Sequence, residues 1–248
     1  MIRTWVLQDA RQSLVLAASR DHLPEIVYWG PRLPAGEDLT TLAQAHVPDV
    51  TGGMLDINPE LSICPEATRT FPGQPGLVVR AADGTPLLPK FCFAGEDAGA
   101  DRVTLTYRDQ NDTLIYRAHF AINPRTHVIT AQAEVEAAQG MHLHWLAAPV
   151  FPGPQQSDEM LDFAGRWCGK FQMNRSAWSA GMRYRENRTG RTGHEHFPGL
   201  LVPCRGATNT QGEAYGFHYG WSGGHRMIAE ELPDGRRQIQ FGHAARVE

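Results

Sequence analysis

The sequence predicts an all-β fold, a large antiparallel β-sandwich with few short helices. Its 25 glycines and 17 prolines are spread between short β-prone segments and do not gather in one linker, which is typical of sandwiches and barrels. Several segments alternate between apolar and polar residues, and in 103–107 the odd positions are apolar and the even ones polar. Such alternation places one face of a strand in a core and the other in solvent, as in many antiparallel sheets.

The same criteria predict the individual elements. The expected strands are 4–16, 26–29, 77–80, 103–108, 114–122, 127–136, 141–150, 214–221, 227–232 and 237–241. Asp-Gly pairs mark two hairpin turns, at 82–85 and 233–236, where glycine supplies a positive φ. A helix is expected only at 38–46, with Asp38 or Thr40 as its N-cap.

Length and composition favour a single domain over residues 1–248. With 248 residues, 42% of them hydrophobic, the chain can fill a sizeable core without disulfides. It has no internal repeat, no low-complexity tract and no clear linker. The Pro/Gly-rich stretch at 149–154 is read as a crossover between sheets, so we expect one domain.

Charge and hydropathy argue against two classes of partner. The formal net charge is −4 with both signs interspersed, so no basic stripe is available to neutralise phosphates and no nucleic acid is expected. The longest apolar run near the N-terminus, 14–18, is too short for a signal-peptide core or a membrane span. We expect a soluble cytoplasmic protein with no membrane partner.

Side chains capable of chemistry form no recognisable catalytic or metal motif. The four cysteines stand at 64, 92, 168 and 204, far apart and without a CxxC pair, which predicts buried free thiols. Histidines pair at 142 and 144 and at 194 and 196, a spacing that places both rings on one face of a strand, but neither pair has an identifiable third ligand. Phosphate-binding loops and nucleophile motifs are absent. We expect no metal and no cofactor.

The tryptophans are candidates for sugar contact, because a flat apolar ring can stack on a sugar while polar neighbours bind its hydroxyls. They are Trp5, Trp29, Trp145, Trp167, Trp178 and Trp221. Since aromatic side chains are often simply buried, we expect most of them in the core and about one or two at a ligand or partner.

A series of short motifs follows one another along the chain. The first two are Tyr-Trp-Gly at 28–30 and Leu-Asp-Ile-Asn-Pro-Glu at 55–60, continued by Pro-Glu at 65–66. The later ones are Ala-Gly-Arg-Trp at 164–167, Glu-Asn-Arg-Thr-Gly-Arg-Thr-Gly-His at 186–194, Phe-Pro at 197–198 and Gln-Gly-Glu-Ala-Tyr-Gly-Phe at 211–217 with Gly-Trp-Ser-Gly-Gly at 220–224. In this order they resemble the N-terminal domain of family 36 glycoside hydrolases, the α-galactosidases, over about 28–225.

The resemblance implies a non-catalytic β-supersandwich domain. Its parent enzyme would hydrolyse terminal α-galactosides such as melibiose or raffinose by a retaining mechanism. Two aspartates of a following (β/α)8 barrel would carry that reaction, and the family's KWDxN nucleophile motif is absent from these residues. We therefore expect no catalytic residue in this chain and no hydrolysis by it alone. The barrel is its expected partner, in a homo-oligomer of the full-length enzyme.

The resemblance also implies candidate contact residues. In tetrameric relatives a loop near an Asp-Phe-Arg motif reaches a neighbouring subunit's active site, where it meets the galactoside. The matching region here is 66–71, with Glu66, Arg69 and Phe71 as candidate sugar contacts. The chain departs from the motif, since Arg-Thr-Phe-Pro-Gly stands at 69–73 and only Phe71 corresponds. An ordinary polar turn is the competing interpretation.

Four further residues are expected at a pocket edge or in a structural role: Trp29, Trp167, Arg188 and His194. For 188–194 we favour the structural role, in which arginines and glycines fix a loop through hydrogen bonds and positive φ.

Three alternatives remain open from the sequence. A galactosyltransferase or an α-N-acetylgalactosaminidase of the same family would look nearly identical over this stretch. A stand-alone carbohydrate-binding β-sandwich would bind galactose by itself. An aldose epimerase-like enzyme would need a histidine and a carboxylate converging in one cleft. A domain of a larger enzyme should also leave an apolar surface uncovered.

Overall fold

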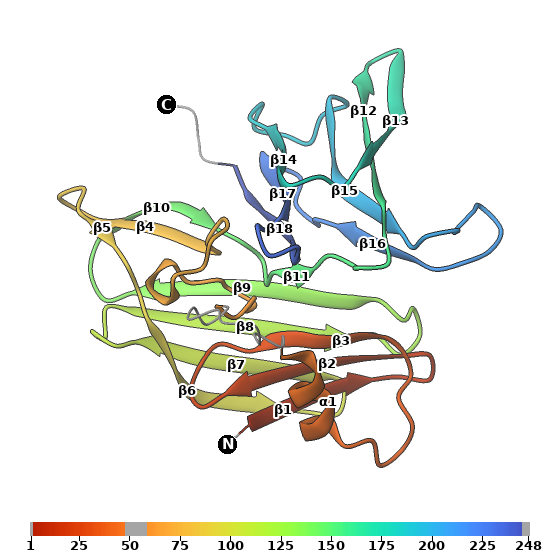
Figure 1. The fold of residues 1–248 in the computed structure, drawn as a ribbon. Helices are drawn as coiled ribbons and strands as arrows, with labels where there is room; N and C mark the ends of the chain where they lie inside the picture. The colour runs from red at the N-terminus through yellow and green to blue at the C-terminus, as the bar shows by residue number, and fades with distance from the viewer. Residues whose placement is uncertain (1, 48–58, 245–248) are drawn as a thin grey trace. The chain divides into compact units, whose positions relative to one another are not determined.

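The computed structural model describes residues 2–47 and 59–244, which form two compact units (Figure 1). Unit 1 comprises 2–47, 59–71 and 75–143, and unit 2 comprises 72–74 and 144–244. Both are built from antiparallel sheets, which confirms the predicted all-β sandwich. Helix α1 (Leu39–His46) is also confirmed, and the Asp38 carboxylate caps it by accepting the backbone N–H groups of Thr40 and Thr41.

Unit 1 begins with a three-stranded sheet of β1 (Ile2–Gln8), β2 (Gln12–Ser19) and β3 (Glu25–Pro31). The prediction of one strand over 4–16 is wrong, because the chain reverses between β1 and β2. The Asp9 carboxylate accepts the backbone N–H groups of Arg11 and Gln12 at 2.7 and 2.9 Å. An aspartate-centred turn of this kind needs no glycine or proline, so it leaves no conspicuous signal in the sequence.

The second sheet of unit 1 is a meander of four strands, which Figure 1 shows as neighbouring arrows. They are β6 (Phe91–Ala98), β7 (Arg102–Asp109), β8 (Leu114–Ile122) and β9 (Ile129–Ala137). β7 and β8 alternate between buried and less buried positions as predicted, and β1 packs against both. Tyr107, Tyr116 and Phe120 are among the largest fully buried side chains of this core.

A small third sheet joins β4 (Leu77–Ala81), β5 (Pro86–Leu87) and β10 (Met141–Leu146), and β10 carries the chain from unit 1 into unit 2. Both predicted Asp-Gly hairpins are present. The turn between β4 and β5 has Gly84 at φ 86°, and the later one has Gly235 at φ 83°. A side chain at this φ is strained, which is why glycine stands there.

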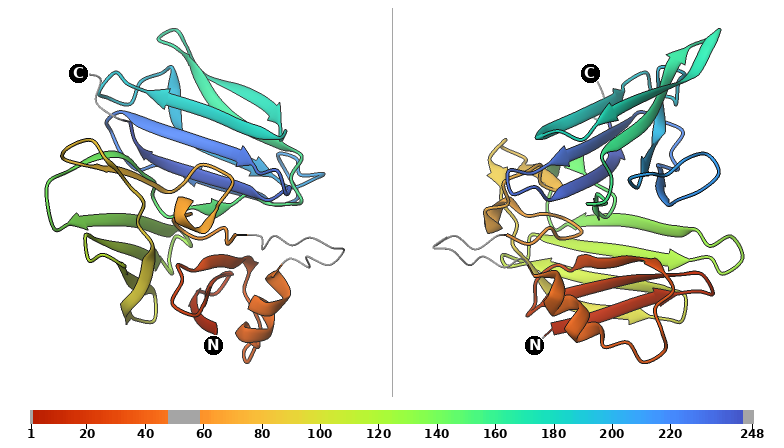
Figure 2. Two further views of the ribbon diagram at one scale, coloured as in Figure 1. Left: turned by 60° about the vertical axis from the view of Figure 1, so that its left-hand side comes forward. Right: turned by 45° about the vertical axis from the view of Figure 1, so that its right-hand side comes forward.

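Unit 2 is a sandwich of two four-stranded sheets, which Figure 2 shows from two further sides. One sheet has the order β11-β18-β17-β14 and the other β13-β12-β15-β16. Their bounds are β11 Phe151–Pro152, β12 Glu159–Arg166, β13 Gly169–Ala177, β14 Gly181–Asn187, β15 His196–Pro203, β16 Ala214–His218, β17 His225–Glu231 and β18 Arg237–His243. Their facing sides bury Met160, Leu200, Val202, Met227 and Ile239 in one core.

Seven strands of the described residues are missing from the predicted set: the two-residue strands β5 and β11, and the longer strands β6, β12, β13, β14 and β15. β13 illustrates the reason, because most of its side chains are exposed and few of them are aliphatic. It is the edge strand of its sheet, so neither of its faces requires the apolar alternation on which the prediction relied.

Buried polar groups hold the short segment 72–74 in unit 2. The backbone N–H of Gln74 donates to the Glu230 carboxylate at 2.8 Å, and the Gln74 carbonyl accepts from the side-chain amides of Gln238 and Gln240. Trp145 completes the network by donating its indole N–H to Gln240 at 2.9 Å. Since every member has a partner, this network orders the segment at little desolvation cost.

The prediction that the four cysteines are buried free thiols is only partly correct. All four are free, but only Cys64 is buried, whereas Cys168 is exposed. Cys168 lies in the two-residue turn between β12 and β13, a position that a core thiol cannot occupy.

We predict that Gly242→Ala destabilises unit 2 by about 2 kcal/mol, because overpacking a filled site costs that much. A Cβ at Gly242 would lie 2.5 Å from the Leu146 carbonyl oxygen and 2.7 Å from the ring of buried Trp145. Urea unfolding of the variant measures the effect. Gly220→Ala is the control, since its Cβ would meet no atom within 4 Å. Equal stability of both variants would contradict this packing.

Candidate functional site

The predicted contact loop, 66–71, is a hydrogen-bonded cluster inside unit 1. Glu66 is buried and accepts the backbone N–H of Phe91 and the Arg69 guanidinium, each at 2.7 Å. Burial raises the pKa of Glu66, while the Phe91 N–H and Arg69 oppose that rise. Thr70 follows at φ 58° and ends the 3-10 turn of 67–69, and Phe71 is buried.

Arg69 connects this loop to two other elements of unit 1. Its guanidinium donates to the His22 ring at 3.0 Å and to the Phe91 carbonyl at 3.2 Å. His22 in turn contacts the Glu60 carboxylate at 2.8 Å. Both the Glu66 and Arg69 side chains are therefore engaged within the unit. No sequence pattern indicates the contact with His22, because His22 lies 47 residues from Arg69 along the chain.

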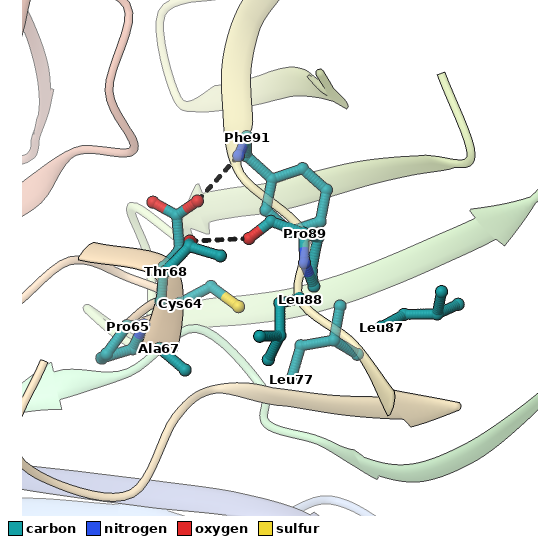
Figure 3. A pocket seen from close by; sticks show the side chains of 10 residues that line it. Cys64, Pro65, Ala67, Thr68, Leu77, Leu87, Leu88, Pro89 and Phe91 are labelled. Carbon is teal, nitrogen blue, oxygen red and sulfur yellow. Dashed lines mark hydrogen bonds between the residues drawn. The ribbon is translucent and has the colours of Figure 1, made fainter. Parts of the chain in front are cut away.

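A small pocket adjoins the loop (Figure 3). Its lining is mainly apolar and includes Cys64, Leu77 and Leu88, and the Thr68 hydroxyl donates to the Pro89 carbonyl at its edge. The cavity of about 20 Å³ has room for about one water molecule. It is therefore too small for a sugar ring.

The motif around 186–194 is a loop held by hydrogen bonds in unit 2. Glu186 on β14 accepts from Arg226 at 2.7 and 2.9 Å and also from Arg188. The Asn187 side chain spans the following turn by donating to the Arg191 carbonyl and accepting from the Thr189 N–H. Gly190 sits at φ 76°. These contacts hold the loop within unit 2, and the structural role of Arg188 and His194 stays a prediction.

The Glu186 carboxylate has a shifted pKa. Burial by itself raises the pKa of Glu186, but hydrogen bonds from Arg226, Arg188 and Tyr184 outweigh burial and hold it below the ordinary 4.5. Asp162 on β12 is likewise buried and accepts from Arg183 and Arg185 of β14, so it joins the two sheets. Carboxylates paired in this way serve as structural cross-links.

Trp167 and His194 are brought together in unit 2. Trp167 lies in the turn between β12 and β13 with 77% of its surface exposed, and its ring meets that of His194 edge to face at 5.4 Å. The Lys170 ammonium lies 5.9 Å from the Trp167 ring centre. Trp29 is in unit 1 instead, on β3, where its indole N–H donates to Gln12 at 3.0 Å. Only Trp5, Trp145 and Trp178 of the six tryptophans are buried.

The outer face of the sheet with β12 carries an aromatic surface. Phe163 of β12 contacts Phe171 of β13 and Phe197 of β15 at ring distances of 6.2 Å, and Phe197 contacts His218 at 5.4 Å. Met173 lies directly opposite Phe163 in the strand pairing. We call Phe163, Phe171, Met173, Phe197 and His218 the outer aromatic face. Phe171 and Met173 are more than half exposed, so apolar area is left uncovered.

Neither a metal cluster nor a membrane helix is found in the described part of the chain. Within residues 2–47 and 59–244, no group of three or more His, Cys, Asp or Glu side chains is arranged to hold a metal ion. Over the same residues, no helix has the length and apolar character that crossing a membrane requires.

Comparison with known proteins identifies the family. The family model described as the glycosyl hydrolase family 36 N-terminal domain matches residues 22–246, which cover unit 2 and all of unit 1 after β2. The chain belongs to this family. The resemblance inferred from the motifs is thereby confirmed, although the part of the early motif at 55–58 lies outside the described residues.

Curated relatives agree with this assignment, and a solved structure shares the fold. An α-galactosidase of Escherichia coli is 31% identical over 97% of this chain, and a probable α-galactosidase C of Aspergillus flavus is 25% identical over 69%. A family 36 α-galactosidase structure from Geobacillus stearothermophilus superposes with a TM-score of 0.82 at 19% identity, covering 97% of this chain and 37% of that one. The family 36 domain described here spans only 33% and 22% of the two curated relatives.

We predict that Glu186 makes unit 2 sensitive to acid. Its lowered pKa contributes stability that is fully present above the ordinary glutamate value of 4.5 and is lost as the pH falls through the folded-state pKa. Glu186→Gln should therefore lose less stability than the wild type on acidification, as measured by urea unfolding at a series of pH values. Glu213→Gln, at an exposed position, is the control. Its free energy of unfolding should depend on pH as that of the wild type does. If the free energy of unfolding depends on pH identically in all three proteins, Glu186 is not the source of the acid sensitivity.

Proposed function

We propose that the chain is the non-catalytic N-terminal domain of an α-galactosidase that hydrolyses terminal α-galactosides of the melibiose or raffinose type. The retaining reaction would be carried by a (β/α)8 barrel outside residues 1–248, and the two units would form one domain beside it. The observation that carries this proposal is the 31% identity to the E. coli α-galactosidase over 97% of this chain but 33% of that enzyme.

The barrel is the proposed partner of this domain. The outer aromatic face offers uncovered apolar area on unit 2, as expected where a further domain would pack. The carboxylates of Glu66, Asp162 and Glu186 accept from arginines. The buried Asp9 and Asp109 instead accept backbone N–H groups, and Asp9 also contacts His127. Each of these carboxylates is therefore engaged in hydrogen bonds that hold the chain in place. Carboxylates engaged in this way favour a structural domain over a catalytic one.

We further propose that the loop 66–71 borders the galactoside site of a homo-oligomer in the cytoplasm. Glu66, Arg69 and Phe71 are engaged within unit 1, so they would shape the loop while its exposed positions, such as Thr70, face outward. Trp29, Trp167, Arg188 and His194 remain proposed pocket-edge or structural residues. A galactoside soaked into crystals of the longer enzyme would test this placement by its contacts.

A second candidate is a stand-alone carbohydrate-binding module. The exposed Trp167 ring, with His194 and Lys170 beside it, is the observation that favours it, because a ring flanked by polar groups suits a sugar. Galactose titration by calorimetry distinguishes the two functions. Saturable heat that Trp167→Ala abolishes would favour the module, and a flat titration would favour the domain of a larger enzyme.

We predict that the 248-residue chain alone does not hydrolyse an aryl α-galactoside. The two carboxylates of a retaining glycosidase lie about 5 Å apart across the sugar, and the buried carboxylates named above are each held by hydrogen bonds from arginines or backbone N–H groups. A chromogenic assay measures the rate, with buffer as the blank. Turnover that rises in proportion to the chain and survives repurification would contradict the proposal.

We also predict that the isolated chain self-associates through the outer aromatic face. Light scattering should report a mass above that of one chain, and the double substitution Phe171→Ser and Met173→Ser should shift it toward the monomer. Val128→Ser, at an exposed apolar residue of unit 1, should leave the mass unchanged. A monodisperse wild-type monomer is the contrary result.

Sequencing the source transcript past codon 248 tests the whole proposal directly. An open frame that encodes a barrel with a Lys-Trp-Asp motif is the expected result. An immediate stop codon would instead favour the carbohydrate-binding module.

A further inference from the structure

A continuous chain of polar side chains in unit 1 runs from Glu60 through His22 and Arg69 to Glu66. The Glu60 carboxylate contacts Nδ1 of His22 at 2.8 Å, and Arg69 contacts Nε2 of the same ring at 3.0 Å. Arg69 then donates to Glu66 at 2.7 Å. The chain therefore joins the turn between β2 and β3, which contains His22, to the loop 66–71.

The partners of His22 determine which nitrogen carries its proton. A guanidinium has only donors, so the nitrogen that meets Arg69, Nε2, must accept the hydrogen bond. An ionised carboxylate has only acceptors, so Nδ1 must donate to Glu60. This arrangement requires a neutral imidazole that is protonated on Nδ1 alone.

A second proton on His22 is incompatible with the Arg69 contact. It would occupy Nε2, remove the acceptor and oppose two N–H groups of like charge. Glu60 would remain as a counter-ion on the other side of the ring, so Arg69 is the partner that must move. The other titratable groups near this cluster are Asp21, Cys92 and Glu66.

We propose that His22 is a pH-sensitive link that orders the loop 66–71. In its neutral form it holds Arg69 against Glu66 and the Phe91 carbonyl, and the 3-10 turn over 67–69 is fixed. When the ring takes up a proton, Arg69 is released and the loop loosens. The inference concerns the order of the loop. Only its consequence for galactoside binding rests on the proposed function.

Amide hydrogen exchange at the turn tests the proposal. The reporters are the backbone N–H groups of Arg69 and Thr70, which donate to the carbonyls of Glu66 and Ala67 at 3.0 and 3.1 Å. After correction for the intrinsic pH dependence of exchange, their rates should rise about fivefold between about pH 7.5 and about pH 5, the effect of losing one hydrogen bond. Unchanged corrected rates in the wild-type chain would overturn the proposal.

A matched pair of variants identifies the titrating group. His22→Gln keeps an acceptor for Arg69 but does not titrate in this range, so its corrected exchange rates should be the same at both pH values. His119→Gln, on β8 and in contact with Thr104, should respond as the wild type does. If His22→Gln keeps the full pH response, another group such as Glu66 is responsible and the proposal fails.

The variant experiments require that each variant folds. A measurement on the wild-type chain tests the proposal without that requirement. Nitrogen-15 chemical shifts of the His22 ring at neutral pH should report the Nδ1–H tautomer. The Nε2–H tautomer or a doubly protonated ring would contradict the hydrogen-bond assignment. Since neither readout uses turnover, failure of this proposal is separate from failure of the α-galactosidase assignment.

Discussion

The constraint that governs this domain is the alternation of side chains across a β-strand. Successive residues point to opposite faces, so each sheet of unit 2 must place one set of side chains in the core and the other set outside. Met160 on β12 and Leu200 on β15 fill the core between the sheets. Phe163 and Phe197 on the same strands therefore form part of the outer aromatic face. Burying the core and presenting an apolar outer surface follow from the same register.

Ion pairs between carboxylates and arginines join neighbouring strands and fix loops within this framework. Asp162 joins β12 to the arginines of β14, and Glu186 joins β14 to Arg226 of β17. Glu66 plays the same role in unit 1, where it fixes the turn that contains Arg69. Each carboxylate is paired, which limits the cost of its burial, but removal of one partner would leave a charge uncompensated. These residues hold loops in place through hydrogen bonds from neighbouring arginines.

The structural use of these carboxylates is consistent with the family to which the chain belongs. Glu66, Asp162 and Glu186 each accept hydrogen bonds from arginines, so in this family 36 domain they stabilise loops and strand pairs. In the loop 66–71, the inner side chains are fixed by Phe91 and His22 and Thr70 faces solvent. If it borders a sugar site, the polar chain through His22 determines how firmly that border is held.

The sequence alone determined the all-β class, the helix capped by Asp38, the two Asp-Gly hairpins and the family motifs, because each depends on local periodicity or on the φ preference of particular residues. It did not reveal the turn at Asp9, which a side-chain hydrogen bond creates, or the polar edge strand β13, which lacks alternation. The pairing of Arg69 with His22, of Asp162 with Arg183 and of Trp167 with His194 was decided only by the tertiary structure. These partners are separated by about 20 to 50 residues, and only the folding of the sheets brings them into contact.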